Sequence, residues 1–560
     1  MQSTMHAPLI GDGPHAGAYR APSVGRNGVV AAAHGLAATA GLRALIDGGT
    51  AVDAAVAVGA ALGVVEPFMS GIGGGGGSML IYEAATHAVH VLDYLGPAPA
   101  AADATAFSSV DEIDADVRSA TVPAVLAGWL TAHQRFGRLE RAALFQPAID
   151  LAENGWPLSP WAAGIFRDYA ARLNRHGSVY AIDADQPAAG AVVTQPDLAR
   201  SYRLIGASGG DVFYRGELGQ RLVASVRAAG GWLSESDLAG YTPRWSEPLT
   251  IDYRGWTVHT PPPPSTGFQY LACLKMLEAT DLTALQHNSA EYLHLVLETI
   301  KLASADRTRY ASAEPSVIDA LLSDEYAARR RQQVDPDRAA PSEGERFVVR
   351  QDGVVRAGTP LAAEHTTHFE VADRWGNLVA VTQSNGAPFG SGFAAGDTGI
   401  VLNNFMYWNE LEPTSPNLLR PGQQGRDMPM APCIVTRNGH LALGIGTPGS
   451  YGILQTTLQM VLNVLDFEMH IQAAIEAPRG ARLRRHAGGC RRPPRARGGV
   501  GAASARPRRA GASALELGRG WRPRHSGRRR TSSVAGRRRP APRWPGGRFL
   551  ARSPGITASP

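Results

Sequence analysis

The chain has 560 residues, 44% of them hydrophobic, which is enough for several ordinary domains or for one large fold with a tail. Its first 20 residues lack the basic start and apolar run of an export signal, and no stretch of about 20 apolar residues could span a bilayer. The three cysteines, Cys273, Cys433 and Cys490, are far apart and lack a metal-ligand spacing. We therefore expect no disulfide framework, no metal site and a cytoplasmic location.

The net charge of +6 is unevenly distributed along the chain. Residues 481–560 contain 22 arginines and a single acidic residue, Glu516, whereas the first 480 residues contain 33 basic and 48 acidic residues. Because this tail keeps no hydrophobic period, we expect it to be disordered. One interpretation is an arginine-rich arm that binds nucleic acid. We favour a second interpretation, in which these residues are translated in the wrong reading frame. Globular folds do not end in an abrupt loss of acidic residues and periodicity.

The amino-terminal part of the sequence predicts two helices, a glycine loop and two strands. An alanine-rich helix is expected over 29–47, and a nearly all-apolar helix over 52–65. The loop SGIGGGGG follows, and then strands over 79–82 and 88–94. Gly71, Gly73 and Gly76 match the letters of a dinucleotide-binding loop, but that loop follows a strand and opens a helix. Here the order is reversed, so we expect these glycines to allow close approach of the backbone instead.

The middle of the chain, from residue 111 to residue 346, is mostly helical in pattern. One extended stretch is expected over 249–259, before four consecutive prolines. The pentapeptide GASGG at 206–210 has the letters of a nucleophile elbow, which requires an apolar strand before its serine. A polar segment of helical period precedes Ser208, so we predict a turn that ends a helix.

Residues 366–480 have a different pattern, in which short strands alternate with tight turns. Strands are predicted over 369–372, 378–383, 434–437 and 441–445, and helices over 451–465 and 471–476. Helices beside antiparallel strands indicate a layered α+β fold. Thr366 and Thr367 precede the first of these strands, either as ordinary β-branched residues that open it or as the site of a nucleophilic hydroxyl.

Several separated motifs, in the same order along the chain, resemble the γ-glutamyltranspeptidase superfamily of N-terminal-nucleophile (Ntn) hydrolases. The resemblance covers about residues 27–479. The motifs are GGTAVDAAVAVGAALGVVEP, AGYTPRWSEPLTIDYRGW, PPPPSTG, ASADRTRY, TTHFEVADRWGNLVAVTQSN, GDTGIVLNNFM, MAPCIV, GTPGSYGILQTTLQM and EAPR. It implies a four-layer αββα fold and a proenzyme that cuts itself into a large chain, residues 1–365, and a small chain, residues 366–480.

The resemblance also implies a catalytic set. Thr366 would become the new amino terminus after a cut behind His365, and its own α-amine, with a pKa of about 7.7–8.0, would be the base that activates its hydroxyl. Ser384 lies where the family has a threonine that hydrogen-bonds the nucleophile. Gly449 and Ser450 correspond to the backbone N–H donors of the oxyanion hole.

The substrate-binding positions depart from the family pattern together. Leu95 stands where transpeptidases have an arginine for the substrate α-carboxylate, and leucine cannot form that contact. The other replaced positions are Phe405, Trp408, Met428, Pro429 and Gly386. The aromatic and aliphatic residues among them suggest an apolar acyl pocket, as in acylase-like relatives, or a site for a small amide, as in oxamate-hydrolysing relatives. Leu95, Phe405 and Trp408 could equally be core residues.

The sequence therefore predicts an autoprocessing amidohydrolase that acts through an acyl-threonine intermediate, without a metal or organic cofactor. We expect a heterodimer of its own two chains that binds a small-molecule amide and no membrane. The alternatives are a γ-glutamyltransferase or glutathione hydrolase and, from another class, a non-enzymatic nucleic-acid binder. If the frame is lost near Arg479, the sheet lacks its final strands, exposes an unpaired edge, and the chain is inactive.

Overall fold

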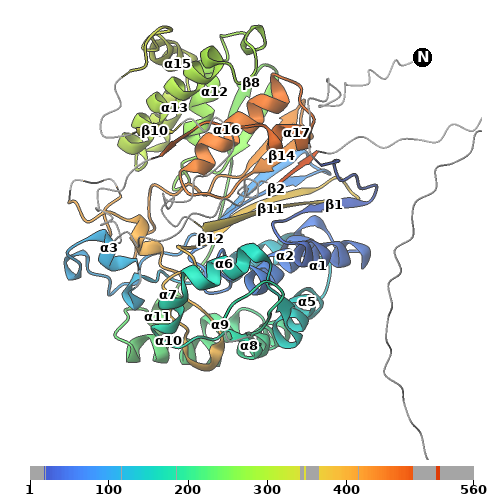
Figure 1. Ribbon diagram of the computed structural model, residues 1–560, viewed down its shortest axis with the longest axis vertical. Helices are drawn as coiled ribbons and strands as arrows, with labels where there is room; N and C mark the ends of the chain where they lie inside the picture. Colours follow the sequence, from blue (N-terminus) through green and yellow to red (C-terminus); the bar gives the residue numbers. More distant parts are fainter. Residues whose placement is uncertain are drawn as a thin grey trace, which may run out of the picture. The chain divides into compact units, whose positions relative to one another are not determined.

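The computed structural model describes residues 18, 20–114, 116–183, 186–340, 346–348, 365–413, 415, 417–483 and 513–516. Two antiparallel sheets pack face to face, and each is covered by helices on its outer side (Figure 1). The expected four-layer αββα Ntn-hydrolase fold is confirmed. None of the described helices is long and apolar enough to cross a membrane.

The first sheet has six strands in the order β1-β11-β12-β2-β3-β7, and every neighbouring pair is antiparallel. Their bounds are Gly28–Ala31 for β1, His365–Asp373 for β11, Leu378–Gly386 for β12, Gly76–Glu83 for β2, Ala88–Asp93 for β3 and Arg244–Ser246 for β7. All nine residues of β12 are buried, which is the pattern of a strand covered on both faces.

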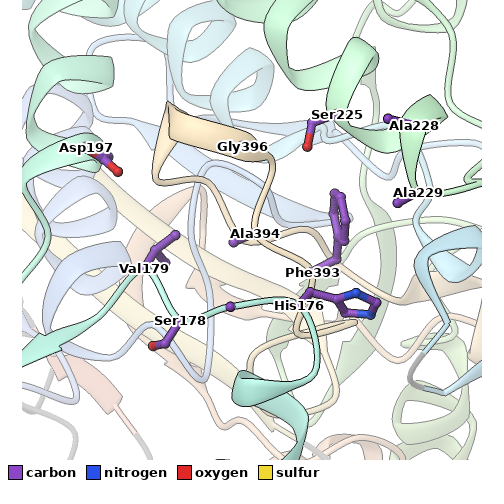
Figure 2. A pocket seen from close by; sticks show the side chains of 11 residues that line it. His176, Ser178, Val179, Asp197, Ser225, Ala228, Ala229, Phe393, Ala394 and Gly396 are labelled. Carbon is purple, nitrogen blue, oxygen red and sulfur yellow. The ribbon is translucent and has the colours of Figure 1, made fainter.

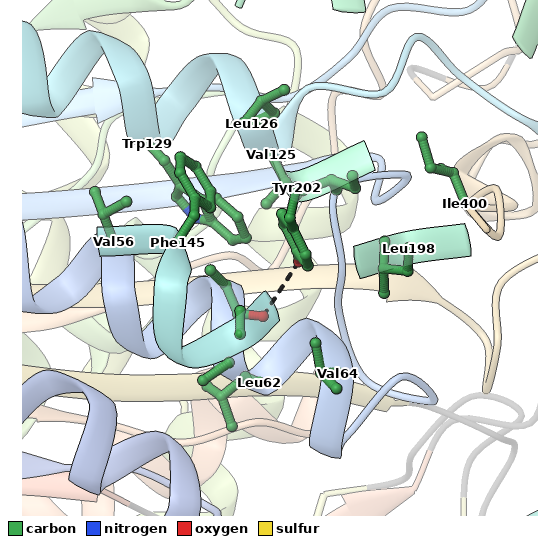
Figure 3. Close-up of a cluster of buried hydrophobic side chains, with 14 of the residues drawn as sticks. Val56, Leu62, Val64, Val125, Leu126, Trp129, Phe145, Leu198, Tyr202 and Ile400 are labelled. Atoms are coloured by element: carbon green, nitrogen blue, oxygen red, sulfur yellow. Dashed lines mark hydrogen bonds between the residues drawn. The ribbon is translucent and has the colours of Figure 1, made fainter. Parts of the chain in front are cut away.

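The helices over this sheet form a large core with its outer face. The elements of this region are α1 (Gly35–Ile46), α2 (Ala51–Val65), α3 (Val110–Ile113), α4 (Val125–Phe136), α5 (Arg141–Asn154), α6 (Pro160–Asp168), α7 (Ala170–Asn174), α8 (Pro196–Ser208), α9 (Asp211–Tyr214), α10 (Glu217–Ala228) and α11 (Glu235–Ala239), with a small sheet of β4 (Trp156–Pro157), β5 (Ala181–Ile182) and β6 (Val192–Thr194). Every residue of α2 is buried, so this helix is the centre of the layer. Figure 3 shows Trp129, Phe145 and Tyr202 around it, and the Tyr202 hydroxyl donates to the Ala60 carbonyl at 3.2 Å.

The second sheet has the order β16-β14-β13-β9-β8. Its strands are Ser513–Glu516 for β16, His440–Gly446 for β14, Cys433–Arg437 for β13, Trp256–Thr260 for β9 and Leu249–Tyr253 for β8. The elements beside it are α12 (Phe268–Leu277), α13 (Ala290–Tyr310), α14 (Pro315–Leu321), α15 (Asp324–Arg331), α16 (Gly452–Leu465), α17 (Ile471–Glu476), β10 (Arg346–Val348) and β15 (Ala481–Leu483). A smaller apolar cluster that includes Leu80, Leu378 and Ile434 fills the space between the two sheets.

Most of the predicted elements are present, with two corrections to their bounds. The helix predicted over 29–47 is wrong at its start, because Val29 and Val30 pair with Ala372 and Val371 of β11 and belong to β1. The extended stretch over 249–259 is two strands, β8 and β9, with Arg254 and Gly255 between them in a turn. Ser208 is the last residue of α8, so the prediction of a helix end there is confirmed.

Two segments of the arginine-rich tail are in strands, contrary to the expectation of a tail without regular structure. β15 pairs with β10, and β16 pairs with β14 along the edge of the second sheet. The expected unpaired edge is therefore wrong at β14, because an edge strand offers backbone N–H and C=O groups that almost any extended segment can satisfy. The rest of 481–560 lies outside the described residues, and the lost reading frame stays a prediction.

Candidate active site

Thr366 lies at an irregularity in the pairing of two central strands. His365 is opposite Gly386 and Thr367 is opposite Gln383, so β12 has one more residue than β11 across this interval. Such a bulge changes the direction in which side chains point and is common beside active sites. Thr366 is 1% exposed, and its Oγ1 donates to Ser384 Oγ at 3.4 Å, which is long for a bond between two hydroxyls.

Ser384 is held in place by its own neighbours on β12 and β2. Its Oγ accepts a hydrogen bond from the Gly386 N–H at 2.9 Å, and the residue lies opposite Gly76 in the β12–β2 pairing. Gly386 has a φ of 97°, and a Cβ there would collide with Asn404 Oδ1. A residue with a side chain at position 386 would therefore be strained in this structure.

Gly449 and Ser450 form the turn that leads into α16. Both have positive φ, 124° and 52°, and the turn is closed by the Gly452 N–H donating to the Gly449 carbonyl at 2.9 Å. The N–H groups of Gly449 and Ser450 donate to no acceptor within the described part of the chain. Two adjacent unpaired N–H groups at the start of a helix can bind an oxyanion.

The buried His368 of β11, the strand that carries Thr366, packs against the segment that leads to this turn. His368 packs against Gly446, the last residue of β14, so closely that a Cβ on Gly446 would overlap its ring. Its Nδ1 lies 2.8 Å from Thr382 Oγ1 and its Nε2 lies 3.1 Å from Glu370 Oε1. Burial lowers the pKa of His368 to about 3, so the ring is neutral at physiological pH.

The four large apolar residues predicted to form the acyl pocket come together. Leu95, Phe405, Trp408 and Met428 form one buried cluster with Met430, which we call the acyl cluster. Tyr407 and Tyr451 pack against it, and the rings of Trp408 and Tyr451 lie 5.7 Å apart. Pro429 is buried beside it. The acyl cluster therefore adjoins the turn at Ser450.

The glycine loop brings the acyl cluster close to Ser384. A Cβ on Gly75 would overlap the Phe405 ring, and one on Gly76 would lie 2.7 Å from Leu95 Cα. The expected close approach of the backbone is confirmed for Gly73 and Gly76, whereas a Cβ on Gly71 would have only ordinary contacts at 3.9 Å. Gly76 of β2 is opposite Ser384 of β12, so Leu95, which follows β3, is separated from Ser384 by β2 and from Thr366 by β2 and β12.

Buried polar atoms without partners surround the acyl cluster. Within the described residues, Trp408 Nε1, Ser450 Oγ and Asp427 Oδ1 have no hydrogen-bond partner. An enclosed polar atom in this state is costly unless a ligand satisfies it. The indole N–H can donate, the carboxylate oxygen can accept, and the hydroxyl can do either.

Two asparagines that sequence reasoning did not single out hold the loops around the site. Asn403 Oδ1 accepts from the N–H groups of Thr121 and Phe405, both at 3.0 Å, and its Nδ2 donates to the Gly73 carbonyl at 3.0 Å. Asn404 Oδ1 accepts from the Ala387 N–H at 2.9 Å. The paired asparagines in the motif GDTGIVLNNFM were the available signal.

A cavity of about 520 Å³ elsewhere in the molecule contains none of these residues (Figure 2). It lies between the segment His176–Val179, the helix α10 and the loop that carries Phe393, whose ring is 5.3 Å from that of His176. Burial lowers the pKa of His176, but no candidate catalytic residue lines this cavity.

The fold, two sheets between helical layers with a threonine at the start of a central strand, is that of the Ntn hydrolases. The chain matches the model of the gamma-glutamyltranspeptidase family over residues 37–484, and it belongs to that family. The match ends close to the position at which the composition of the sequence changes.

Its relatives include both acylases and glutathione hydrolases. It is 35% identical to the Acylase ACY 1 proenzyme of Pseudomonas sp. (strain V22), over 82% of this chain and 83% of the relative. It is 34% identical to the glutathione hydrolase proenzyme of Bacillus subtilis (strain 168), over 82% and 81%. Among solved structures, a cephalosporin acylase from Bacillus halodurans has a TM-score of 0.71 and 30% identity, covering 84% of this chain and 86% of that one. The expected likeness to acylases is confirmed.

Proposed function

We propose that the protein is an autoprocessing N-terminal-threonine amidohydrolase that cuts its own chain between His365 and Thr366 and then hydrolyses an amide with an apolar or small acyl group. The observation that carries this proposal is the buried Thr366 hydroxyl, placed at a strand bulge within 3.4 Å of Ser384 Oγ. The unpaired N–H groups of Gly449 and Ser450 support it.

In maturation, Thr366 Oγ1 attacks the carbonyl carbon of His365, and the peptide nitrogen leaves as the α-amine of Thr366. The product is an ester between His365 and the threonine side chain. Water then hydrolyses this ester, which releases the His365 carboxylate and returns the hydrogen to Thr366 Oγ1. The two resulting chains stay together as a heterodimer.

In turnover, the same hydroxyl attacks the substrate amide while the α-amine accepts its proton. The negative charge on the carbonyl oxygen of the tetrahedral intermediate is stabilised by the N–H groups of Gly449 and Ser450. The leaving amine takes the proton from the α-ammonium group. Water then hydrolyses the acyl-threonine ester, with the α-amine again as base. No step requires a metal or cofactor.

Substrate preference follows from the acyl cluster. Its four predicted members are apolar and each is at most 4% exposed, so none of these four side chains supplies a cation for an α-carboxylate. The enclosed Trp408 indole N–H can donate to one oxygen of an acyl group or an oxamic amide. We therefore propose poor turnover of γ-glutamyl compounds.

The processing test compares three chains on a denaturing gel. The unmodified protein gives two fragments, the smaller beginning Thr-Thr-His-Phe, whereas Thr366→Ala stays a single chain without amidase activity. Thr367→Val is the matched control, because the buried Thr367 hydroxyl has no partner among the described residues and its loss leaves processing intact. Amidase activity in unprocessed Thr366→Ala would overturn the mechanism.

A second candidate function, γ-glutamyl transfer or glutathione hydrolysis, is favoured by the 34% identity to a glutathione hydrolase proenzyme. The processed protein is assayed on a γ-glutamyl anilide, a hexanoyl anilide and an oxamic amide. We expect kcat/KM for one of the last two to exceed that for the γ-glutamyl anilide at least tenfold. The reverse order, with efficient glutathione hydrolysis, would establish the second candidate.

A further inference from the structure

The candidate nucleophile and the candidate oxyanion donors belong to different sheets. Thr366 is in β11 of the first sheet, whereas Gly449 and Ser450 follow β14 of the second sheet. The distance between the two groups therefore depends on how closely the sheets pack at this point. A displacement of about 1 Å at a reacting centre can cost about a hundredfold in rate, so this spacing matters for the chemistry.

Two glycines of β14 bring the sheets close together here. Gly444 and Gly446 are two residues apart, so they lie on the same face of the strand, and that face is turned towards the first sheet. A Cβ on Gly446 would lie 2.2 Å from His368 Cε1, and one on Gly444 would lie 3.4 Å from Glu370 Cδ. The backbone of β14 is thus in direct contact with side chains of β11, and a single layer of side chains separates the two strands.

The His368 ring is held at both of its nitrogens. Nδ1 lies 2.8 Å from Thr382 Oγ1 on the neighbouring strand β12, and Nε2 lies 3.1 Å from Glu370 Oε1 on the same strand. The side chains of His368 and Glu370 are completely buried. Rotation of the ring would break both contacts inside the protein, where lost hydrogen bonds are costly. A planar ring held in this way keeps a constant width between β11 and the backbone of β14.

Thr366 lies on the same face of the first sheet as this ring. Thr382 and Ser384 are two residues apart on β12 and therefore point to the same side. His368 contacts Thr382, and the Thr366 hydroxyl donates to Ser384 Oγ at 3.4 Å. The candidate nucleophile and the ring are thus neighbours in one row of polar side chains that faces the second sheet.

A short, stiff link joins Gly446 to the turn that carries the oxyanion donors. Only Thr447 and Pro448 separate Gly446 from Gly449. Proline fixes its own φ at about −65° and restricts the residue before it to extended conformations, so this link has little freedom. A shift of Gly446 relative to the histidine ring is therefore passed on to the N–H groups of the turn.

We propose that His368 is a positioning residue whose ring sets the distance between the Thr366 hydroxyl and the oxyanion donors that follow β14. The proposal rests on the function proposed above and adds a residue that acts through the backbone of Gly446 rather than on the substrate. The carbonyl oxygen gains its negative charge only after the attack, so correct spacing stabilises the transition state more than the bound substrate. Loss of the spacing should therefore lower kcat and leave KM nearly unchanged.

The test changes the contact from each sheet separately. His368→Asn removes the part of the ring that reaches β14, and Gly446→Ala adds a methyl group that collides with the ring but alters no buried polar group. The substrate is whichever of hexanoyl anilide and the oxamic amide the unmodified protein cleaves faster, and kcat is calculated per mole of processed chain. We expect each variant to lower kcat at least tenfold and to keep KM within about twofold.

The double variant His368→Asn/Gly446→Ala separates a direct contact from two independent effects. Because the smaller side chain relieves the collision, Gly446→Ala should lower kcat less in the His368→Asn background than in the unmodified protein. Losses that simply multiply would overturn the proposal, since the two residues would then act independently.

His259→Asn is the matched control. His259 Nε2 lies 2.9 Å from Thr436 Oγ1, so this variant also changes a histidine that is paired with a threonine on a neighbouring strand. That pair joins β9 to β13, whereas Gly446 belongs to β14. Both kcat and KM of the control should stay at the values of the unmodified protein. A control that loses kcat as much as His368→Asn would mean that the loss reflects general damage to the fold, which overturns the positioning role.

Different results separate failure of the spacer from failure of the proposed function. If amides are cleaved and both single variants keep kcat, the positioning role is overturned and the function stands. If the unmodified protein cleaves neither amide, the proposed function fails.

In that case, or if neither variant yields processed chain, crystal structures of Thr366→Ala with and without Gly446→Ala decide on the spacer. A change of at least about 0.5 Å between Cβ of residue 366 and the Ser450 nitrogen supports it, and an unchanged distance overturns it.

Discussion

Ser450 has a φ of 52°, a conformation that residues with a Cβ adopt at a cost of about 1 kcal/mol or more. Its buried hydroxyl has no partner among the described residues. We therefore expect Ser450→Gly to raise the free energy of unfolding by about 1 kcal/mol, measured by chemical denaturation in the single-chain Thr366→Ala background. With Thr366 present, processing should continue, because only the backbone N–H of residue 450 is proposed to act. Loss of processing in Ser450→Gly would mean that the hydroxyl has a chemical role.

Glu66 is a second residue whose burial has a measurable consequence. Burial raises the pKa of its carboxyl from 4.5 to about 8, and its Oε2 has no partner among the described residues. A raised pKa in the folded state confers stability that is fully present below pH 4.5 and is lost as the pH rises through about 8. Glu66→Gln should remove this decline, so the variant is more stable than its parent by a few kcal/mol at pH 8 and differs least at pH 4.5.

The measurement for Glu66 is the free energy of unfolding at several pH values between 4.5 and 8.5. Glu247→Gln, at an exposed loop position, is the control and should keep the pH dependence of the parent. A Glu66→Gln protein with the same slope as its parent would contradict the assignment.

At the scale of elements, a buried ion pair joins α13 to the strands and turns around the acyl cluster. Arg307 pairs with Asp427, donates to Gln269 Oε1 at 2.8 Å, and lies 4.1 Å above the ring of Tyr451. The Tyr451 hydroxyl in turn donates to the Asp427 carbonyl at 3.2 Å. These contacts fix the residue that follows Ser450.

Removal of one partner of this pair should cost more than removal of both. Arg307→Leu leaves the Asp427 carboxylate buried without its cation, at an expected cost of about 3–5 kcal/mol in the free energy of unfolding. Arg307→Leu/Asp427→Leu should recover most of that loss, and the exposed Arg309→Leu on the same helix should have little effect. Equal losses in the single and double variants would exclude the ion pair as the cause.

The helices and strands also show how much of the fold could be predicted from the sequence. The helices α2, α16 and α17 were predicted within one residue at each end, because strong apolar periods and clear boundary residues coincide there. β1 was assigned to a helix because its two valines precede an alanine-rich run, and only the pairing with β11 makes them a strand. The bulge at Thr366 depends on how two strands align, and no local pattern in either strand encodes that.

Some residues of the candidate site could be predicted and others could not, because contacts between distant segments depend on the fold. Thr366, Ser384, Gly449 and Ser450 lie in motifs that resemble a family, so the sequence indicates them as candidates. The residues of the acyl cluster come from three separate segments, and their contact is a property of the fold. Asn403 lies in the motif GDTGIVLNNFM, but its contacts with Thr121, Phe405 and Gly73 depend on how separate loops pack, which the motif does not encode.

At the scale of the whole molecule, β16 covers an edge that would otherwise be open. Removal of residues 519–560, which begin where the compact unit ends, should leave the thermal midpoint within about 2 °C. Removal of 511–560 also deletes β16, so it exposes the β14 edge and should lower solubility. The two truncated chains are compared by sedimentation and thermal unfolding, and identical behaviour would mean that β16 does not protect the sheet.

The order of strands has a consequence for a chain that is cut before Thr366. In the first sheet, β11 and β12 would come from the small fragment, with β1 on one side and β2, β3 and β7 of the large fragment on the other. In the second sheet, β13 of the small fragment would pair with β9 of the large fragment. The fragments are therefore interlocked, and neither can dissociate while the sheets persist. Once the cut protein is unfolded, two separate chains must meet again before either sheet can form, so refolding becomes a bimolecular reaction that slows on dilution.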